Sequence, residues 1–102
     1  MTDTPNITNT VILLEGTEAA GVSREARLAP GHRVLFQLQV TGLQGTEAIL
    51  EGSVDGVVFS PLIPSGESGD VLIVDGFYNY VKVPPFVRVV TTGSGVRVAG
   101  TA

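Results

Sequence analysis

Glycine and proline are spread along the whole chain, and this feature limits the possible folds more than any other. The 102 residues include 13 Gly and 6 Pro. Both types interrupt helices, because glycine loses the most backbone freedom on folding and proline lacks the amide hydrogen. The pieces between them are too short for a long helix, so the sequence predicts short strands.

The segment 32–41 has the clearest strand pattern. Apolar residues occupy every second position, and mostly polar residues stand between them; the apolar ones are Val34, Phe36, Leu38 and Val40. A period of two is typical of a strand with one buried face. Other segments rich in β-branched residues predict further strands. These are residues 7–14, 48–54, 57–62, 70–74, 77–83, 86–91 and 95–99.

Residues 17–29 depart from this pattern and include some helix-favouring residues. Gly21 within the segment and Pro30 after it oppose any helix longer than a turn or two, so we expect extended chain. About eight short strands without a βαβ rhythm predict one all-β domain. We expect residues 1–102 to form a single antiparallel β-sandwich, either jelly-roll-like or immunoglobulin-like, with residues 1–10 as an N-terminal arm.

Two Asp-Gly pairs predict turns. Asp55-Gly56 lies between two predicted strands and is typical of a tight two-residue hairpin, because Gly tolerates the positive φ that such a turn requires. Asp75-Gly76 has the same chemistry. It predicts either a second hairpin or a bulge or bend at a sheet edge.

The composition offers little for catalysis or for nucleic-acid binding. A net charge of -4, with only 6 Lys+Arg, lacks the basic surface that phosphate backbones require. The chain has no cysteine and 1 histidine, so thiol chemistry and the usual zinc ligand sets are missing. That histidine, His32, follows Pro30-Gly31, where we expect a solvated loop side chain rather than a catalytic base.

The acidic residues fall mostly at turns and outward strand positions, where solvation explains them; they include Glu47, Glu51, Asp55, Glu67, Asp70 and Asp75. Neither the paired carboxylates of a glycosidase nor an EF-hand calcium loop is indicated by their spacing. The glycine-rich segments 66–69 and 93–95 lack the Lys and the following helix of a phosphate-binding loop. We therefore predict no catalytic residue, no cofactor and no metal ligand.

The N-terminal sequence lacks the positive and apolar regions of a secretory signal, so we expect no secretion by that route. Apolar runs such as residues 71–74 are too short for a membrane-spanning helix, and we expect no membrane role. Asn6 heads a formal glycosylation motif, which we interpret as a chance match.

The surface is expected to be poor in charge. Charged residues make up 16% of the chain, against roughly 25% in an average soluble domain. Lys82, Arg88 and Arg97 predict one solvated face, which leaves the faces around Phe59, Leu62 and residues 71–74 short of charge. Such surfaces usually meet a partner. We therefore expect a homo-oligomer, for instance a trimer, or many copies on a larger assembly.

The C-terminal half carries short motifs in a recurrent order. Residues 50–62 read LEGSVDGVVFSPL, residues 78–83 read YNYVKV and residues 95–98 read GVRV. A Gly-Ser-x-Asp-Gly hairpin, an aromatic residue and a Tyr-x-Tyr strand in this order resemble small β-sandwich virion proteins of tailed bacteriophages. The sequence departs from that pattern at Lys82, where Arg is more usual, and at Phe59, where Trp often stands.

The resemblance implies a non-enzymatic capsid decoration or cement protein, or a fibre component. Such a protein is made in the host cytoplasm and binds the major capsid protein or another virion protein. The same hairpin is also similar to one in discoidin-type jelly rolls, which bind glycans or lipids through loops at one end. A carbohydrate-binding module is therefore the alternative, although that family normally has longer chains and often a disulfide.

Overall fold

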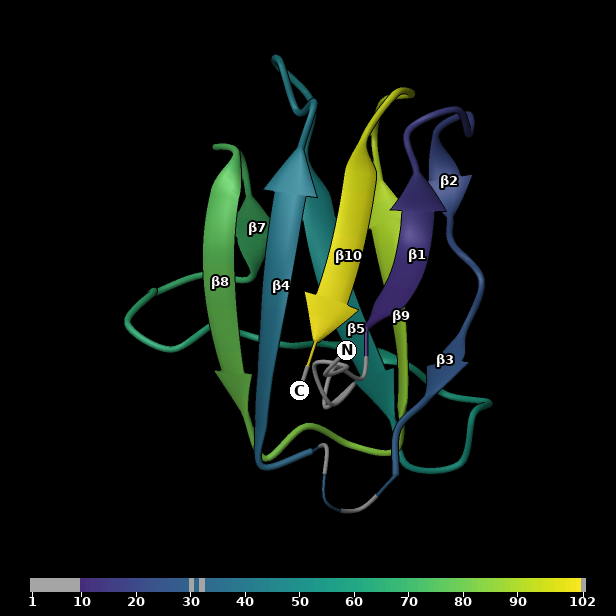
Figure 1. Ribbon diagram of the computed structural model, residues 1–102, viewed down its shortest axis with the longest axis vertical. Helices are drawn as coiled ribbons and strands as arrows, with labels where there is room; N and C mark the ends of the chain where they lie inside the picture. Colours follow the sequence, from purple (N-terminus) through teal and green to yellow (C-terminus); the bar gives the residue numbers. More distant parts are fainter. Residues whose placement is uncertain (1–9, 30, 32, 102) are drawn as a thin grey trace, which may run out of the picture.

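Two antiparallel sheets pack face to face in this protein (Figure 1). The computed structural model describes residues 10–29, 31 and 33–101. These residues form ten strands and no α-helix, which confirms the predicted all-β sandwich. One sheet contains β1 (Val11–Glu15), β10 (Arg97–Thr101), β4 (Leu35–Thr41) and β8 (Gly76–Val81), in that order. The other contains β5 (Ala48–Ser53), β9 (Phe86–Thr91), β2 (Gly21–Val22), β3 (Ala26–Arg27), β6 (Ser60–Pro61) and β7 (Val71–Leu72).

The second sheet has two long central strands and two divided edges. β5 pairs with β9, both β2 and β3 pair with β9, and both β6 and β7 pair with β5. Each edge is therefore one strand position split into two short segments. With β2/β3 and β6/β7 each counted once, the sandwich has eight strand positions, the number expected, but not the same eight. The predicted strands 57–62 and 70–74 share one position as β6 and β7, and β2/β3 fill a position that was not predicted.

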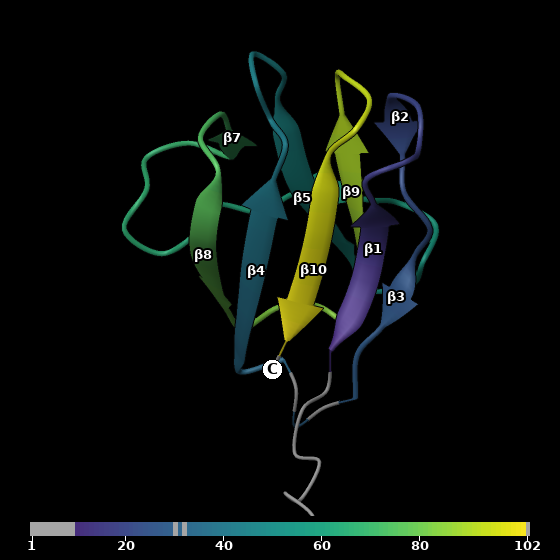
Figure 2. The same cartoon turned by 45° about the horizontal axis from the view of Figure 1, so that its top comes forward.

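Most connections cross from one sheet to the other. The chain changes sheet after β1, β3, β4, β7, β8 and β9. Figure 2 shows these crossings as loops at the two ends of the sandwich. This strand order is that of a jelly roll, and it decides against the immunoglobulin-like alternative.

The alternating segment of the sequence supplies the centre of the core. Phe36, Leu38 and Val40 point inward from β4 and are fully buried. Val34 was expected to share this face, but it precedes β4 and is 70% exposed. The facing sheet contributes buried side chains from β5 and β9, namely Ala48, Leu50, Val87 and Val89. Two sheets with one apolar side each therefore hide those sides against one another.

Residues 17–29 are extended, as predicted, and run along β9. Ser23 lies between β2 and β3 and is buried there. Its amide donates to Val89 O at 2.8 Å, and its Oγ accepts from Val89 N, also at 2.8 Å. This side chain replaces a ladder bond at the point where the edge strand is divided.

The predicted tight hairpin at Asp55-Gly56 is wrong. Gly52 pairs with Ser60, so residues 54–59 form a longer loop between β5 and β6. The physical reason is competition from polar side chains, because Ser53 Oγ accepts from Gly56 N and Asp55 Oδ1 accepts from Val57 N. Such bonds stabilise a wider turn in place of ladder pairing. Gly56 does have a positive φ, 78°.

The hairpin predicted at Asp75-Gly76 is wrong, but the alternative of a bend at a sheet edge is close to what the structure shows: the chain bends at Val74 and Asp75, and Gly76 begins the edge strand β8. The pair lies where the chain crosses from β7 in one sheet to β8 in the other. The Asp75 carboxylate accepts from Gly42 N at 3.0 Å and from Leu43 N at 2.9 Å. Asp75 therefore ties together two loops at the same end of the sandwich.

Candidate interaction surfaces

The loop of residues 54–59, here called the valine loop, displays apolar side chains on a fixed backbone. Val54, Val57 and Val58 are 79%, 78% and 70% exposed. Asp55 Oδ1 accepts from the amides of Val57 and Val58 at 2.8 and 3.1 Å, and from Ser53 Oγ at 2.8 Å. These bonds, led by the one from Val57, hold the pKa of the Asp55 carboxyl below its usual value. The hydrogen bonds keep the valines outside the core.

The end of the valine loop is attached to the outer side of the six-stranded sheet. The Arg88 guanidinium carbon lies 4.0 Å from the centre of the Phe59 ring. Arg88 Nε donates to Glu51 Oε1 at 2.8 Å. This stack neutralises the two charges on neighbouring strands and fixes Phe59 over them.

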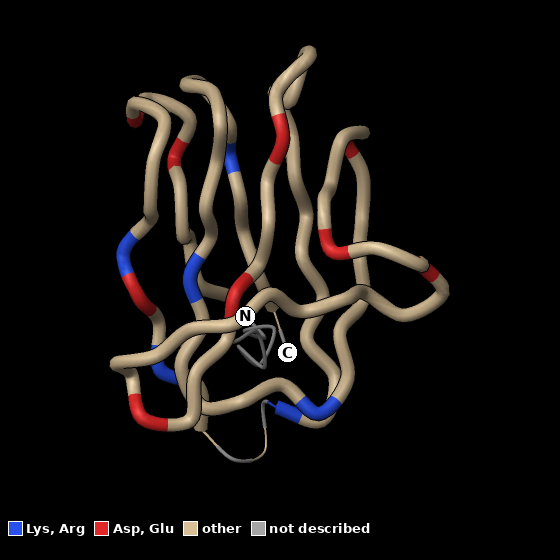
Figure 3. Tube along the Cα trace, turned by 180° about the vertical axis from the view of Figure 1, so that it is seen from behind, with Lys and Arg blue, Asp and Glu red and all other residues tan. Residues whose placement is uncertain are grey.

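The predicted single face for Lys82, Arg88 and Arg97 is wrong. Arg88 lies on β9 and Arg97 on β10, and these strands belong to different sheets. Both residues point away from the core, so they lie on opposite outer sides of the sandwich. Lys82 follows the end of β8 with a positive φ of 54°. Charge is spread thinly over the molecule, and Figure 3 shows the charged positions scattered along the trace.

An apolar row crosses the outer side of the six-stranded sheet. The register places Val22 opposite Val90, Val90 opposite Ile49, and Ile49 opposite Val71. Directly opposed residues point to the same side of a sheet. Val22 and Val71 at the two edges are exposed, as are Ile73 and Val74 just beyond β7. This row agrees with the expected lack of charge around residues 71–74. The same expectation is wrong around Phe59, whose ring lies against Arg88, itself bonded to Glu51.

The outer side of the four-stranded sheet, here called the front face, is mainly amide and apolar. The register opposes Leu35 to Val81, Gln37 to Asn79, and Gln39 to Phe77 across β4 and β8. Ala99 and Thr101 continue the face on β10. The charged residues on its described strands, Glu15 and Arg97, stand opposite one another in the β1–β10 register, at one end of the face. Within the part of the chain that the structure describes, the centre of the front face therefore carries no charged side chain.

The predicted polar candidates are dispersed. Glu51, Asp55 and Asp75 each have a structural partner, as described above, and no group of three or more His, Cys, Asp or Glu gathers among the described residues. His32 and residues 1–9 of the predicted arm lie outside the described residues. Within the described part of the chain, no helix has both the length and the apolar character needed to span a membrane.

Comparisons with known proteins give one structural likeness. No protein-family model matches the chain, and no curated protein matches it. A pentameric capsid protein isolated from metagenomic phage sequences aligns with 98% of this chain, at 16% identity and a TM-score of 0.40. The aligned part covers 66% of that capsid protein, so the present chain spans just under two thirds of its length.

Sequence reasoning missed the front face and the valine loop as distinct surfaces. The front face was indicated by Gln37 and Gln39 at alternate positions, but its partner strand, β8, could not be identified from local pattern. For the valine loop, the signal was Val57 and Val58 side by side. The signal is weak, because adjacent valines also occur inside a strand, as Val89 and Val90 do in β9; only their exposure in the structure separates the two cases.

Proposed function

We propose that the protein is a non-enzymatic structural component of a bacteriophage virion, a capsid decoration or cement protein that stabilises the shell by protein–protein contacts. The observation that carries the proposal is the valine loop, whose exposed apolar side chains stand on a backbone held by Ser53 and Asp55. A loop already ordered before binding loses little conformational freedom when it docks. Exposed apolar groups of this kind usually contact another protein.

The apolar row on the six-stranded sheet supports the same proposal. It provides a second uncharged surface, so one molecule can contact the shell and a neighbouring copy at once. We therefore propose that the protein works as a homo-oligomer, for instance a trimer, or as many copies on the capsid. A specific contact of this kind should bury at least about 1,000 Å². Sedimentation velocity on the free protein measures the first part of this proposal.

Co-sedimentation with capsids of the phage that carries the gene tests the function. Val58→Asp should weaken capsid binding by at least about tenfold, because an unpaired carboxylate would be buried at the contact. Val34→Asp is the matched control, since Val34 is also 70% exposed but precedes β4, outside the valine loop.

Wild-type protein and the Val34→Asp variant should bind equally. The proposal is contradicted if wild-type protein does not sediment with capsids. It is also contradicted if Val58→Asp, folded by circular dichroism, binds as well as the wild type does.

A further inference from the structure

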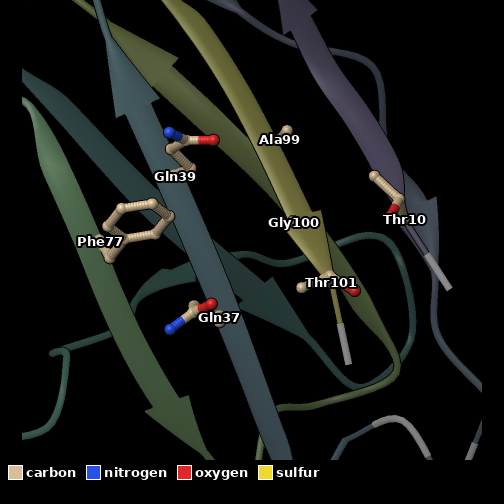
Figure 4. Close-up of a pocket in the computed structure, with 7 residues that line it drawn as sticks. All are labelled: Thr10, Gln37, Gln39, Phe77, Ala99, Gly100 and Thr101. Carbon is tan, nitrogen blue, oxygen red and sulfur yellow. The ribbon is translucent and has the colours of Figure 1, made fainter. Parts of the chain in front are cut away.

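A hollow of about 180 Å³ lies on the front face, on the side of the molecule opposite the apolar row (Figure 4). It exists because Ala99, the outward residue of β10 there, has a small side chain. Gly100 lines it through its backbone, since a side chain at that position would point inward to Phe36. Phe77, Gln37 and Gln39 line it from β8 and β4. Thr101 and Thr10 line the other side.

An aromatic ring and amide groups dominate the hollow. Phe77 is 64% exposed, and Figure 4 shows the broad side of its ring turned outward. Gln37 Nε2 donates to Asn79 Oδ1 at 3.1 Å, which orients both amides. The side chains of Gln37 and Gln39 stand about 7 Å apart along β4, and each offers donors and an acceptor.

We propose that this hollow binds one ring of a neutral oligosaccharide. A sugar ring has a face of C–H groups that packs on an aromatic ring, and hydroxyls at its rim that donate and accept hydrogen bonds. Phe77 supplies the first contact, and the amides of Gln37 and Gln39 supply the second. The volume is below the roughly 300 Å³ of drug-sized pockets, so it fits a single ring of a chain that continues across the open face.

Other occupants fit the same residues less well. A lipid chain or an apolar protein surface would cover Gln37 and Gln39 without replacing their hydrogen bonds to water. Among the described residues no charged side chain lines the hollow, so a charged glycan meets no opposite charge there. Glu15 and Arg97 stand opposite one another in the register, at the far end of the face. This inference goes beyond the proposed function and does not rest on it.

Two-dimensional NMR of the full chain tests the site, with neutral oligosaccharides of glucose, galactose, mannose and N-acetylglucosamine as probes and a heparin fragment as the charged comparison. Amide shifts should follow at least one neutral probe and gather around Phe77, Gln37 and Gln39. Phe77→Ala should weaken that binding at least about tenfold. Ala99→Leu should also abolish it, because an outward side chain on the floor fills the hollow.

Val81→Ala is the matched control, since Val81 is exposed on the same side of β8 but does not line the hollow. Its affinity should equal that of the wild type. The proposal is overturned if no neutral probe shifts these resonances at about 10 mM, a concentration that detects millimolar affinity. It is also overturned if Phe77→Ala and Ala99→Leu bind as wild type, if only heparin binds, or if Phe77→Ala changes the oligomeric state without any sugar binding.

Discussion

The replacement Gly100→Ala tests how tightly the two central strands of the four-stranded sheet pack. A Cβ added at Gly100 would lie 2.9 Å from Cε1 and Cε2 of Phe36 and closer still to Cζ. Real Cβ atoms essentially never come within 3.0 Å of another heavy atom. Phe36 is fully buried, so its ring cannot turn away into solvent.

The expected cost comes from two opposing effects. Overpacking of a core costs about 1–3 kcal/mol. Replacing Gly by Ala restricts the unfolded chain and returns about 0.4–1 kcal/mol where the backbone tolerates it, as it does here, since φ is not positive. We therefore expect Gly100→Ala to lower the free energy of unfolding by about 1–2 kcal/mol.

The matched control is Gly69→Ala, because Gly69 has no positive φ and no atom within 4 Å of the added Cβ. This control should leave the free energy of unfolding unchanged or raise it by up to about 1 kcal/mol. Urea unfolding followed by circular dichroism measures both variants.

A double-mutant cycle identifies the clash itself. Phe36→Leu alone should cost about 1–2 kcal/mol for the space it leaves, but it also removes the ring atoms that the new Cβ meets. The double variant should therefore be less destabilised than the two single costs added together, by at least about 1 kcal/mol. Additive costs, or a Gly100→Ala variant as stable as Gly69→Ala, would refute the reasoning.

Further variants test a buried hydroxyl and the valine loop. The Tyr80 hydroxyl is buried without a hydrogen-bond partner among the described residues, so Tyr80→Phe should leave stability unchanged or raise it by up to about 2 kcal/mol in urea unfolding. Burial also raises the pKa of the Tyr80 hydroxyl above its ordinary 10.0, so this tyrosine ionises in the unfolded state at a lower pH than in the folded state. The free energy of unfolding of the wild type should therefore fall above pH 10.0, and that of Tyr80→Phe should fall less. For Asp55, whose pKa is lowered in the folded protein, stability depends on pH in acid. The ionised carboxylate stabilises the folded state above the ordinary pKa of 3.8, and this stabilisation is lost as pH falls through the lowered pKa. The difference in Tm between wild type and Asp55→Asn should therefore shrink in acid, and a constant difference would contradict this assignment. Gly56→Val should cost more than about 1 kcal/mol, because φ is 78° there, and an unchanged unfolding midpoint would argue against that backbone conformation.

Local pattern in the sequence was enough to identify the long strands, but not β2 and β3, and it predicted a strand from residue 57, inside the valine loop. The alternation in residues 32–41 predicted the inward positions of Phe36, Leu38 and Val40, all of which are buried. This works because side-chain direction in a strand depends only on position along the backbone. Glycine at 21 and Pro30 likewise excluded a helix in residues 17–29, since their effect on the backbone is also local.

Pairing between strands was decided by the tertiary structure alone. Arg88 and Arg97 fall at alternate positions in the last two predicted strands, which suggested that they lie on one face. The chain crosses to the other sheet between β9 and β10, so they do not. Asp55-Gly56 and Asp75-Gly76 have the same local chemistry, yet one lies in a loop within a sheet and the other in a crossing between sheets. The difference arises from distant partners, such as the amides of Gly42 and Leu43 that bind Asp75. A contact between residues far apart in the chain depends on the packing of both sheets, and no pattern within a single segment contains that information.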